Sequence, residues 1–153
     1  MIVRDAEPAD RDAIRALVTE TLAEFGLPIE PTGIDADLDD ITASYQDRGG
    51  AFRVVEDDAA TIVGCAGLYP LDAKRVELRK MYFRPDARGR GLARDLLIDL
   101  IERARSGGFE RVELETASNL TAAIRLYQGF GFIESHGPKH SCRCDRTFAL
   151  TLR

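Results

Sequence analysis

The sequence predicts an α/β fold, with a mixed, mostly antiparallel central sheet of about seven strands and about four flanking helices. Three observations lead to this prediction. Apolar residues recur with the period of helices before Gly49-Gly50 and with the period of strands after it. The first two strands after these glycines flank a short polar turn, which favours an antiparallel hairpin. Farther on, a strand, a helix and another strand follow one another, which favours a parallel pair.

The first part of the chain predicts one short strand and two helices. Met1–Asp5 is expected to form an edge strand, and a helix is expected from Pro8 until Gly26-Leu27-Pro28 stops it. A shorter helix is expected between Ile34 and Tyr45. Its first turns are acidic from Asp35 to Asp40, which suits the positive end of a helix dipole and is also common on a solvated helix start.

The rest of the chain alternates between strands and helices. A helix should follow Arg88-Gly89-Arg90-Gly91 and end at Gly107-Gly108. The second helix of this part should span Asn119 to Gln128. The expected strands are 51–56, 61–69, 75–83, 112–116, 132–135 and 147–152.

Length, charge and composition narrow the class of protein. A chain of 153 residues without repeats or linkers suits one domain over residues 1–153. We expect a cytoplasmic protein, because the N-terminus is acidic and the three cysteines have no regular spacing. No apolar run is long enough to span a membrane, so no membrane partner is expected. A net charge of −5 argues against a nucleic-acid partner.

One cationic window stands out within this acidic chain. Lys74 to Arg94 contains eight basic and two acidic residues, a local charge of +6. Gly89 and Gly91 let the backbone turn tightly where a helix begins, and free N–H groups at a helix start bind anions. The window therefore predicts a pyrophosphate ligand. Neither nucleotide motif fits, because Arg94 replaces the third glycine of the dinucleotide fingerprint and the P-loop pattern is absent.

Two motifs resemble those of the GNAT N-acetyltransferases. Arg88-Gly89-Arg90-Gly91-Leu92-Ala93 resembles the R/Q-x-x-G-x-G/A signature, and Leu126-Tyr127-Gln128-Gly129-Phe130-Gly131-Phe132 resembles L-Y-x-x-x-G-F. The order of elements is similar along nearly the whole chain. The strand from Glu77 to Phe83 further resembles a bacterial branch of uncharacterised small-molecule enzymes in this family.

The resemblance implies acetyl-CoA as co-substrate and a splay between the fourth and fifth strands. It places the CoA pyrophosphate on Arg88, Gly89, Arg90, Gly91, Leu92, Ala93 and Arg94, and the pantetheine arm beside Met81, Tyr82 and Phe83. A backbone N–H near Met81 would stabilise the oxyanion that forms. Asn119 lies one position from the asparagine that often contacts CoA in the family; helix capping is the alternative role for it.

Tyr127, Glu77 and Glu115 are the candidate catalytic residues. The family's matching tyrosine protonates the leaving thiolate, and some members carry a catalytic carboxylate at the position of Glu77. Because an alkyl ammonium must lose a proton before it attacks, a base is needed. Glu77 and Arg79 share a strand face and could instead simply pair with neighbours, and Glu115 could act through a bound water.

The late polar loop carries His140, Cys142 and Cys144, and the two cysteines are expected on the same strand face. No partner cluster with zinc spacing accompanies them, so no metal is expected. In the family this loop lies near the acceptor, so His136, His140 and Cys142 are candidates for shaping that pocket. Cys65 is expected in the core.

The acceptor is predicted only as a primary amine, with a small molecule or an amino acid favoured. Arg79 could hold the carboxylate of an amino acid, and the acidic run 35–40 could attract a polyamine. Two alternatives stay open: a protein or peptide N-acetyltransferase, and a non-catalytic acyl-CoA-binding module. A homodimer is possible, as in many members of the family.

Overall fold

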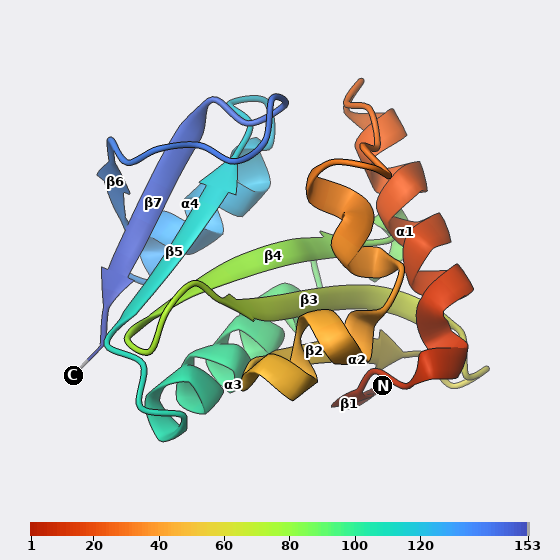
Figure 1. Ribbon diagram of the computed structural model, residues 1–153. Coiled ribbons are helices and arrows are strands. Elements are labelled where there is room, and N and C mark those ends of the chain that lie inside the picture. Colours follow the sequence, from red (N-terminus) through yellow and green to blue (C-terminus); the bar gives the residue numbers. More distant parts are fainter. Residues whose placement is uncertain (153) are drawn as a thin grey trace.

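The computed structural model describes residues 1–152. Within this range the predicted seven strands and four helices are confirmed (Figure 1). The strands are β1 (Ile2–Asp5), β2 (Ala51–Glu56), β3 (Ile62–Pro70), β4 (Arg75–Phe83), β5 (Arg111–Thr116), β6 (Ile133–Ser135) and β7 (Arg146–Thr151). The helices are α1 (Arg11–Glu24), α2 (Ile41–Ser44), α3 (Leu92–Ser106) and α4 (Thr121–Gly129). Four short 3₁₀ turns are η1 (Pro8–Asp10), η2 (Ile34–Leu38), η3 (Gln46–Arg48) and η4 (Pro85–Ala87).

The strands form one mixed sheet in the order β1-β2-β3-β4-β5-β7-β6. All neighbours are antiparallel except β4 and β5, which run parallel. Their register begins at Arg75 with Arg111 and ends at Leu78 with Leu114. Beyond Leu78 the two strands diverge into a V, which is the splay predicted between the fourth and fifth strands (Figure 1).

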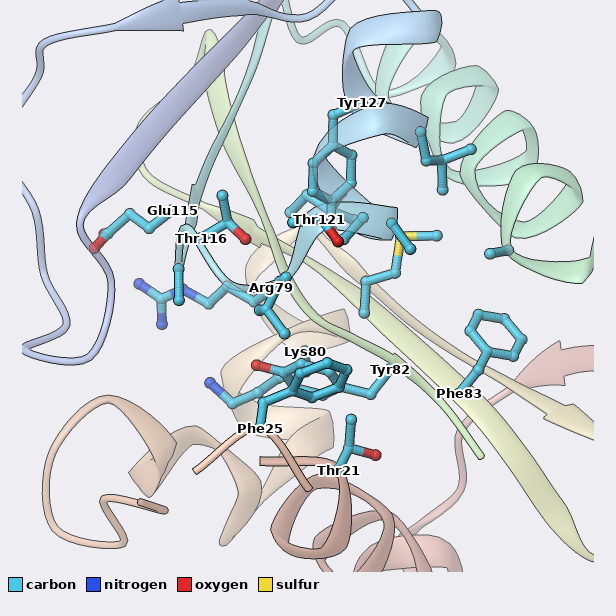
Figure 2. Close-up of a pocket in the computed structure, with 18 of the residues that line it drawn as sticks. Thr21, Phe25, Arg79, Lys80, Tyr82, Phe83, Glu115, Thr116, Thr121 and Tyr127 are labelled. Atoms are coloured by element: carbon cyan, nitrogen blue, oxygen red, sulfur yellow. The ribbon is translucent and has the colours of Figure 1, made fainter. Parts of the chain in front are cut away.

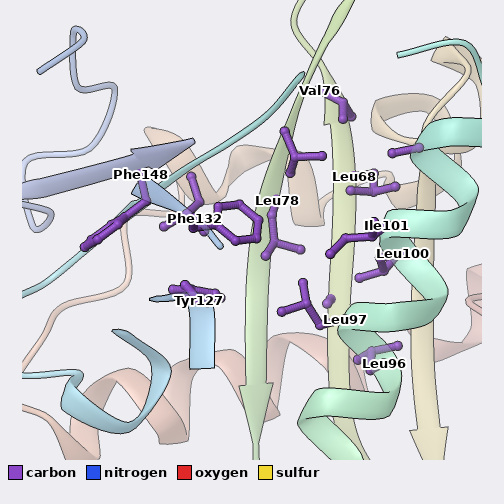
Figure 3. Close-up of a cluster of buried hydrophobic side chains, with 14 of the residues drawn as sticks. Leu68, Val76, Leu78, Leu96, Leu97, Leu100, Ile101, Tyr127, Phe132 and Phe148 are labelled. Atoms are coloured by element: carbon purple, nitrogen blue, oxygen red, sulfur yellow. The ribbon is translucent and has the colours of Figure 1, made fainter. Parts of the chain in front are cut away.

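Helices cover both faces of the sheet, so its central strands are buried on both sides. On one face α1 contributes Leu17 and Val18 to a cluster with Phe52 and Val54. On the other, α3 and α4 pack on Leu78 and its neighbours (Figure 3). This explains why β3 is a nearly continuous buried run in place of an alternating one. β4 thus lies in the middle of the sheet, between the two cores.

The structure differs from the sequence prediction in the second helix. The segment expected as one helix from Ile34 to Tyr45 consists of η2 and the four-residue α2, followed by η3. Asp35 is fully buried and so cannot belong to a solvated helix start. The Asp40 side chain then accepts a hydrogen bond from the backbone N–H of Ala43 at 3.0 Å and starts α2 as its N-cap.

Two smaller differences lie near the C-terminal end. α4 begins at Thr121, and Leu120 occupies the N-cap position without a side-chain bond, so the capping role considered for Asn119 is wrong. Cys142 and Cys144 precede β7 in a turn-rich segment and therefore do not share a strand face. Among residues 1–152, no helix has both the length and the apolar character needed to cross a bilayer.

Candidate active site

A cavity of about 400 Å³ opens where β4 leaves β5. Its size is typical of small-ligand sites. The end of α1, the second half of β4, the start of α3, the end of β5 and the start of α4 all contribute to its walls (Figure 2). The aromatic rings of Phe25 and Tyr82 cover one side of it. The site therefore occupies the gap that the sheet itself leaves open.

The turn before α3 provides a backbone anion site at one end of the cavity. Gly89 and Gly91 have φ values of +75° and +77°, a conformation that side chains with a Cβ rarely adopt. Open space surrounds both, since a Cβ built on either would meet no atom within 4 Å. The first N–H groups of α3 have no partner within the helix, so they suit a pyrophosphate. Gly89, Gly91, Leu92 and Ala93 all line the cavity.

The three arginines of this turn lie in different places. Arg88 lines the cavity but is held by Glu24 at 2.6 and 2.9 Å and donates to the backbone oxygen of Phe83 at 3.0 Å, so it fastens the turn to α1 and β4. Arg94 lines the cavity and lies over the ring of Phe130. Arg90 is exposed and outside the cavity wall.

The second half of β4 supplies the cavity with a free strand edge. Met81, Tyr82 and Phe83 all line it, beyond the last residue paired with β5. The register with β3 shifts at this point, and Lys80 has a φ of +58°, which marks a bulge that redirects the strand. An extended ligand arm could pair with this edge as a strand would.

Tyr127 extends from α4 with its hydroxyl directed into the cavity (Figure 2). The residue is only 6% exposed, and its ring packs on Phe132. The hydroxyl has no hydrogen-bond partner among residues 1–152. Burial raises the pKa of Tyr127, and the nearby Tyr82 and Cys144 add to this. The phenol is therefore protonated at neutral pH and free to donate.

Glu77 and Glu115 also line the cavity, and each is engaged by neighbours. The Arg79 guanidinium donates to Glu77 on the same strand face and stacks 3.8 Å from the centre of the Tyr69 ring. Glu115 accepts the backbone N–H of His140 at 2.8 and 2.9 Å and the N–H of Ser141 at 3.1 Å. The two carboxylates are thus brought to one place by β4, β5 and the late loop.

His140 completes a cluster with these carboxylates. Its Nδ1 lies 2.7 Å from Glu115 Oε2 and 3.4 Å from Glu77 Oε2. The three groups lie within 4.8 Å of one another, a spacing that a metal ion could use. Hydrogen bonds from Arg79 and from two backbone N–H groups already reach Glu77 Oε1 and both oxygens of Glu115, so we assign no metal there.

A buried ionic network behind the cavity was missed by the sequence analysis. Asp35 accepts hydrogen bonds from Arg143 at 2.6 and 2.9 Å and lies 3.0 Å from Lys80 Nζ. Burial would raise the pKa of Asp35, but the hydrogen bonds from Arg143 and the charge of Lys80 lower it to about 2. Lys80 and Arg143 line the cavity, so the network fixes this end of its wall.

Asn119 lies outside the cavity wall, and its Nδ2 donates to the backbone oxygen of Phe25 at 2.9 Å. This bond connects the start of α4 with the end of α1. Cys65 is fully buried, as expected, and its thiol donates to the backbone oxygen of Lys80 at 3.1 Å. Cys142 is exposed, whereas Cys144 lines the cavity.

Comparisons with known proteins agree with this geometry. Residues 14–132 match the Acetyltransferase (GNAT) family. The uncharacterised N-acetyltransferase YjgM of Escherichia coli is 38% identical over 136 residues, covering 86% of this chain and 81% of that protein. A GNAT acetyltransferase structure from Staphylococcus aureus Mu50 has a TM-score of 0.92 at 22% identity over 99% of each chain.

A third protein was solved with its cofactor. The putative acetyltransferase YncA of Salmonella typhimurium, in complex with acetyl-CoA, has a TM-score of 0.76 at 26% identity, covering 100% of this chain and 94% of that one. Together with the family match over residues 14–132, the splayed sheet and the glycine turn place this chain in the GNAT family of acetyltransferases.

Proposed function

We propose that this protein transfers an acetyl group from acetyl-CoA directly to a primary amine of a small molecule or an amino acid. One observation carries the proposal: a protonated, unpartnered Tyr127 hydroxyl opens into the same cavity as the carboxylates of Glu77 and Glu115. Acylation of an amine requires an acid for the leaving thiolate and a base for the amine proton, and this cavity contains both kinds of group. Acetyl-CoA, when bound, supplies the acetyl group as a thioester.

The cavity has a suitable surface for each part of acetyl-CoA. The turn at Gly89 and Gly91 would hold the pyrophosphate, while Met81 and Phe83 would flank the arm. Backbone N–H groups at the β4 bulge would polarise the carbonyl. Tyr127 would protonate the sulfur as the C–S bond breaks. Glu77 or Glu115 would accept the proton that the amine loses.

We assign the end of the cavity beside Lys80 and Arg143 to the amine and call it the acceptor end. It favours a compact substrate because two loops close over it. Ser141 donates to Glu30 at 3.2 Å, and Arg143 contacts both Glu30 and the buried Asp35. An extended peptide would need an open groove where these contacts join the loops. Arg79 is already engaged with Glu77, so a substrate carboxylate would have to share it.

Ligand-dependent stability is the first test of the proposal. Acetyl-CoA at about a hundred times its dissociation constant should add about 2.7 kcal/mol and raise Tm by roughly 5–10 °C, while NAD and ATP should not. Thiol release across amino acids, polyamines and peptides would then identify the acceptor class. Binding without turnover on any acceptor would support a non-catalytic module, and turnover on peptides alone would contradict a small acceptor.

Replacing the phenol tests the assignment of the acid. Tyr127→Phe should lower kcat about 100-fold with little change in the KM for acetyl-CoA, because the lost group acts on the leaving thiolate. Tyr69→Phe removes a hydroxyl outside the cavity wall and is the matched control. An unchanged kcat in Tyr127→Phe would remove Tyr127 from this role.

A further inference from the structure

His140 connects the buried carboxylates to solvent. The side chains of Glu77 and Glu115 are only 5% and 8% exposed, whereas that of His140 is 47% exposed. Its Nδ1 approaches both carboxylates, at 3.4 and 2.7 Å. The imidazole is therefore a single side chain that touches both candidate bases and water.

The contacts of the late loop keep the imidazole in this position. The backbone N–H groups of His140 and Ser141 donate to Glu115, and Arg143 is tied to the buried Asp35. None of these bonds uses the His140 side chain. A substitution of that side chain can therefore remove the imidazole and leave the loop attached.

Other groups around the cluster are unsuited to moving a proton. Arg79, beside Glu77, keeps its proton throughout the working range of an enzyme. Burial raises the pKa of Cys144, near both glutamates, to about 11, so its thiol stays protonated. Arg143 is held by Asp35 and Glu30, and Asp37 faces Arg79 and Lys80. An imidazole is a common proton carrier in enzymes, and that of His140 contacts both carboxylates.

We propose that His140 carries the proton of the acceptor amine from the Glu77–Glu115 pair to solvent. This inference rests on the proposed acetyl transfer. In each turnover an N–H bond of the ammonium breaks and an O–H bond forms on one carboxyl group. That O–H bond then breaks as an N–H bond forms on the imidazole, which releases a proton to water or buffer. No electron is gained or lost, and the carboxylate is restored for the next cycle.

Chemical rescue distinguishes a proton carrier from a residue that only shapes the pocket. In weakly buffered solution, His140→Gln should lower kcat at least about 10-fold. Added imidazole should restore much of this rate in the variant and leave the wild type unchanged, after subtraction of the enzyme-free reaction. The KM for acetyl-CoA should not change. His136→Gln is the matched control, because the structure places His136 outside the cavity wall, in contrast to the sequence prediction, and His136 is exposed and not part of the cluster.

Each other outcome overturns the relay. An active wild type with an undiminished His140→Gln variant would leave the proposed function intact and remove His140 from it. A loss that imidazole does not relieve, with a raised KM for the acceptor, would make His140 a pocket-shaping residue. Activity removed by a chelator and restored by a divalent cation would make the cluster a metal site. A wild type that turns over no acceptor would defeat the proposed function itself, and the relay with it.

Discussion

The two ends of the cavity, which we assign to acetyl-CoA (the donor end) and to the amine (the acceptor end), are built by different means. The donor end consists largely of one continuous stretch, from Met81 to Arg94, in which backbone N–H groups and two glycines do most of the positioning. The acceptor end joins segments far apart in the sequence through charged side chains. Arg143 and Asp35 are separated by 108 positions, and His140 and Glu115 by 25.

This difference separates a site that depends on the backbone from one that depends on particular side chains. A backbone amide donates whatever its side chain is, so a short turn with glycines is enough for the common donor. Recognition of an acceptor depends on side-chain groups that can be exchanged while the sheet stays in place. Asp35 is the centre of the acceptor end, since Lys80, Arg143 and the backbone N–H of Glu30 all converge on it.

The largest expected effect on stability comes from removing the charge of Asp35. Asp35→Asn would leave Lys80 and Arg143 buried without their shared counter-charge, a loss of about 3–5 kcal/mol. Thermal unfolding should show a fall in Tm of about 10 °C. Asp39→Asn removes an exposed partner of Arg15 and should change stability by less than about 1 kcal/mol.

Ligand binding to the same variant sharpens the comparison between the two ends. Well below its Tm, Asp35→Asn should keep its acetyl-CoA affinity within about 3-fold and lose affinity for the acceptor. Equal losses for both ligands would show that the two ends of the cavity are not independent.

Acid should reproduce part of this effect in the wild type. The folded-state pKa of Asp35 is about 2, below its ordinary value of 3.8. Its stabilising contribution is therefore complete above about pH 4 and is lost as pH falls toward 2, an amount of about 2 kcal/mol. Urea unfolding at several pH values should show that the difference in unfolding free energy between wild type and Asp35→Asn becomes smaller as the pH falls over this window. A difference that stays the same at all pH values would exclude Asp35 as the source of the acid destabilisation.

The sequence predicted the donor end of the cavity better than the acceptor end. The parallel strand pair, the glycine turn and the helix after it follow local rules of backbone and periodicity, and each is confirmed. The acidic run at 35–40 looked like a solvated helix start, yet Asp35 and Asp37 face inward. Their partners Lys80 and Arg143 lie in distant segments, and spacing carries no signal for such pairs.

For Glu77 and Glu115, strand alternation predicted one part of their surroundings and missed another. Strand alternation placed Glu77 and Arg79 on one face, and on that face Arg79 donates to Glu77. Alternation along β5 could not predict that Glu115 would receive the backbone of the loop at His140 and Ser141, because the loop has no period of its own. His140 was therefore predicted only as a residue near the acceptor.

The smallest expected effect tests whether the donor end depends on backbone conformation at one place. Gly91 and Gly108, just before and just after α3, have φ values of +77° and +83°, and a Cβ on either would meet no atom within 4 Å. Alanine should thus cost about 1–2 kcal/mol at each, lowering Tm by a few degrees in both variants. Only Gly91→Ala should also weaken acetyl-CoA binding, by about 10-fold in titration calorimetry, because only Gly91 lies on the cavity. An equal loss of affinity in Gly108→Ala would mean that general destabilisation of α3, and not the shape of the turn, controls the donor end.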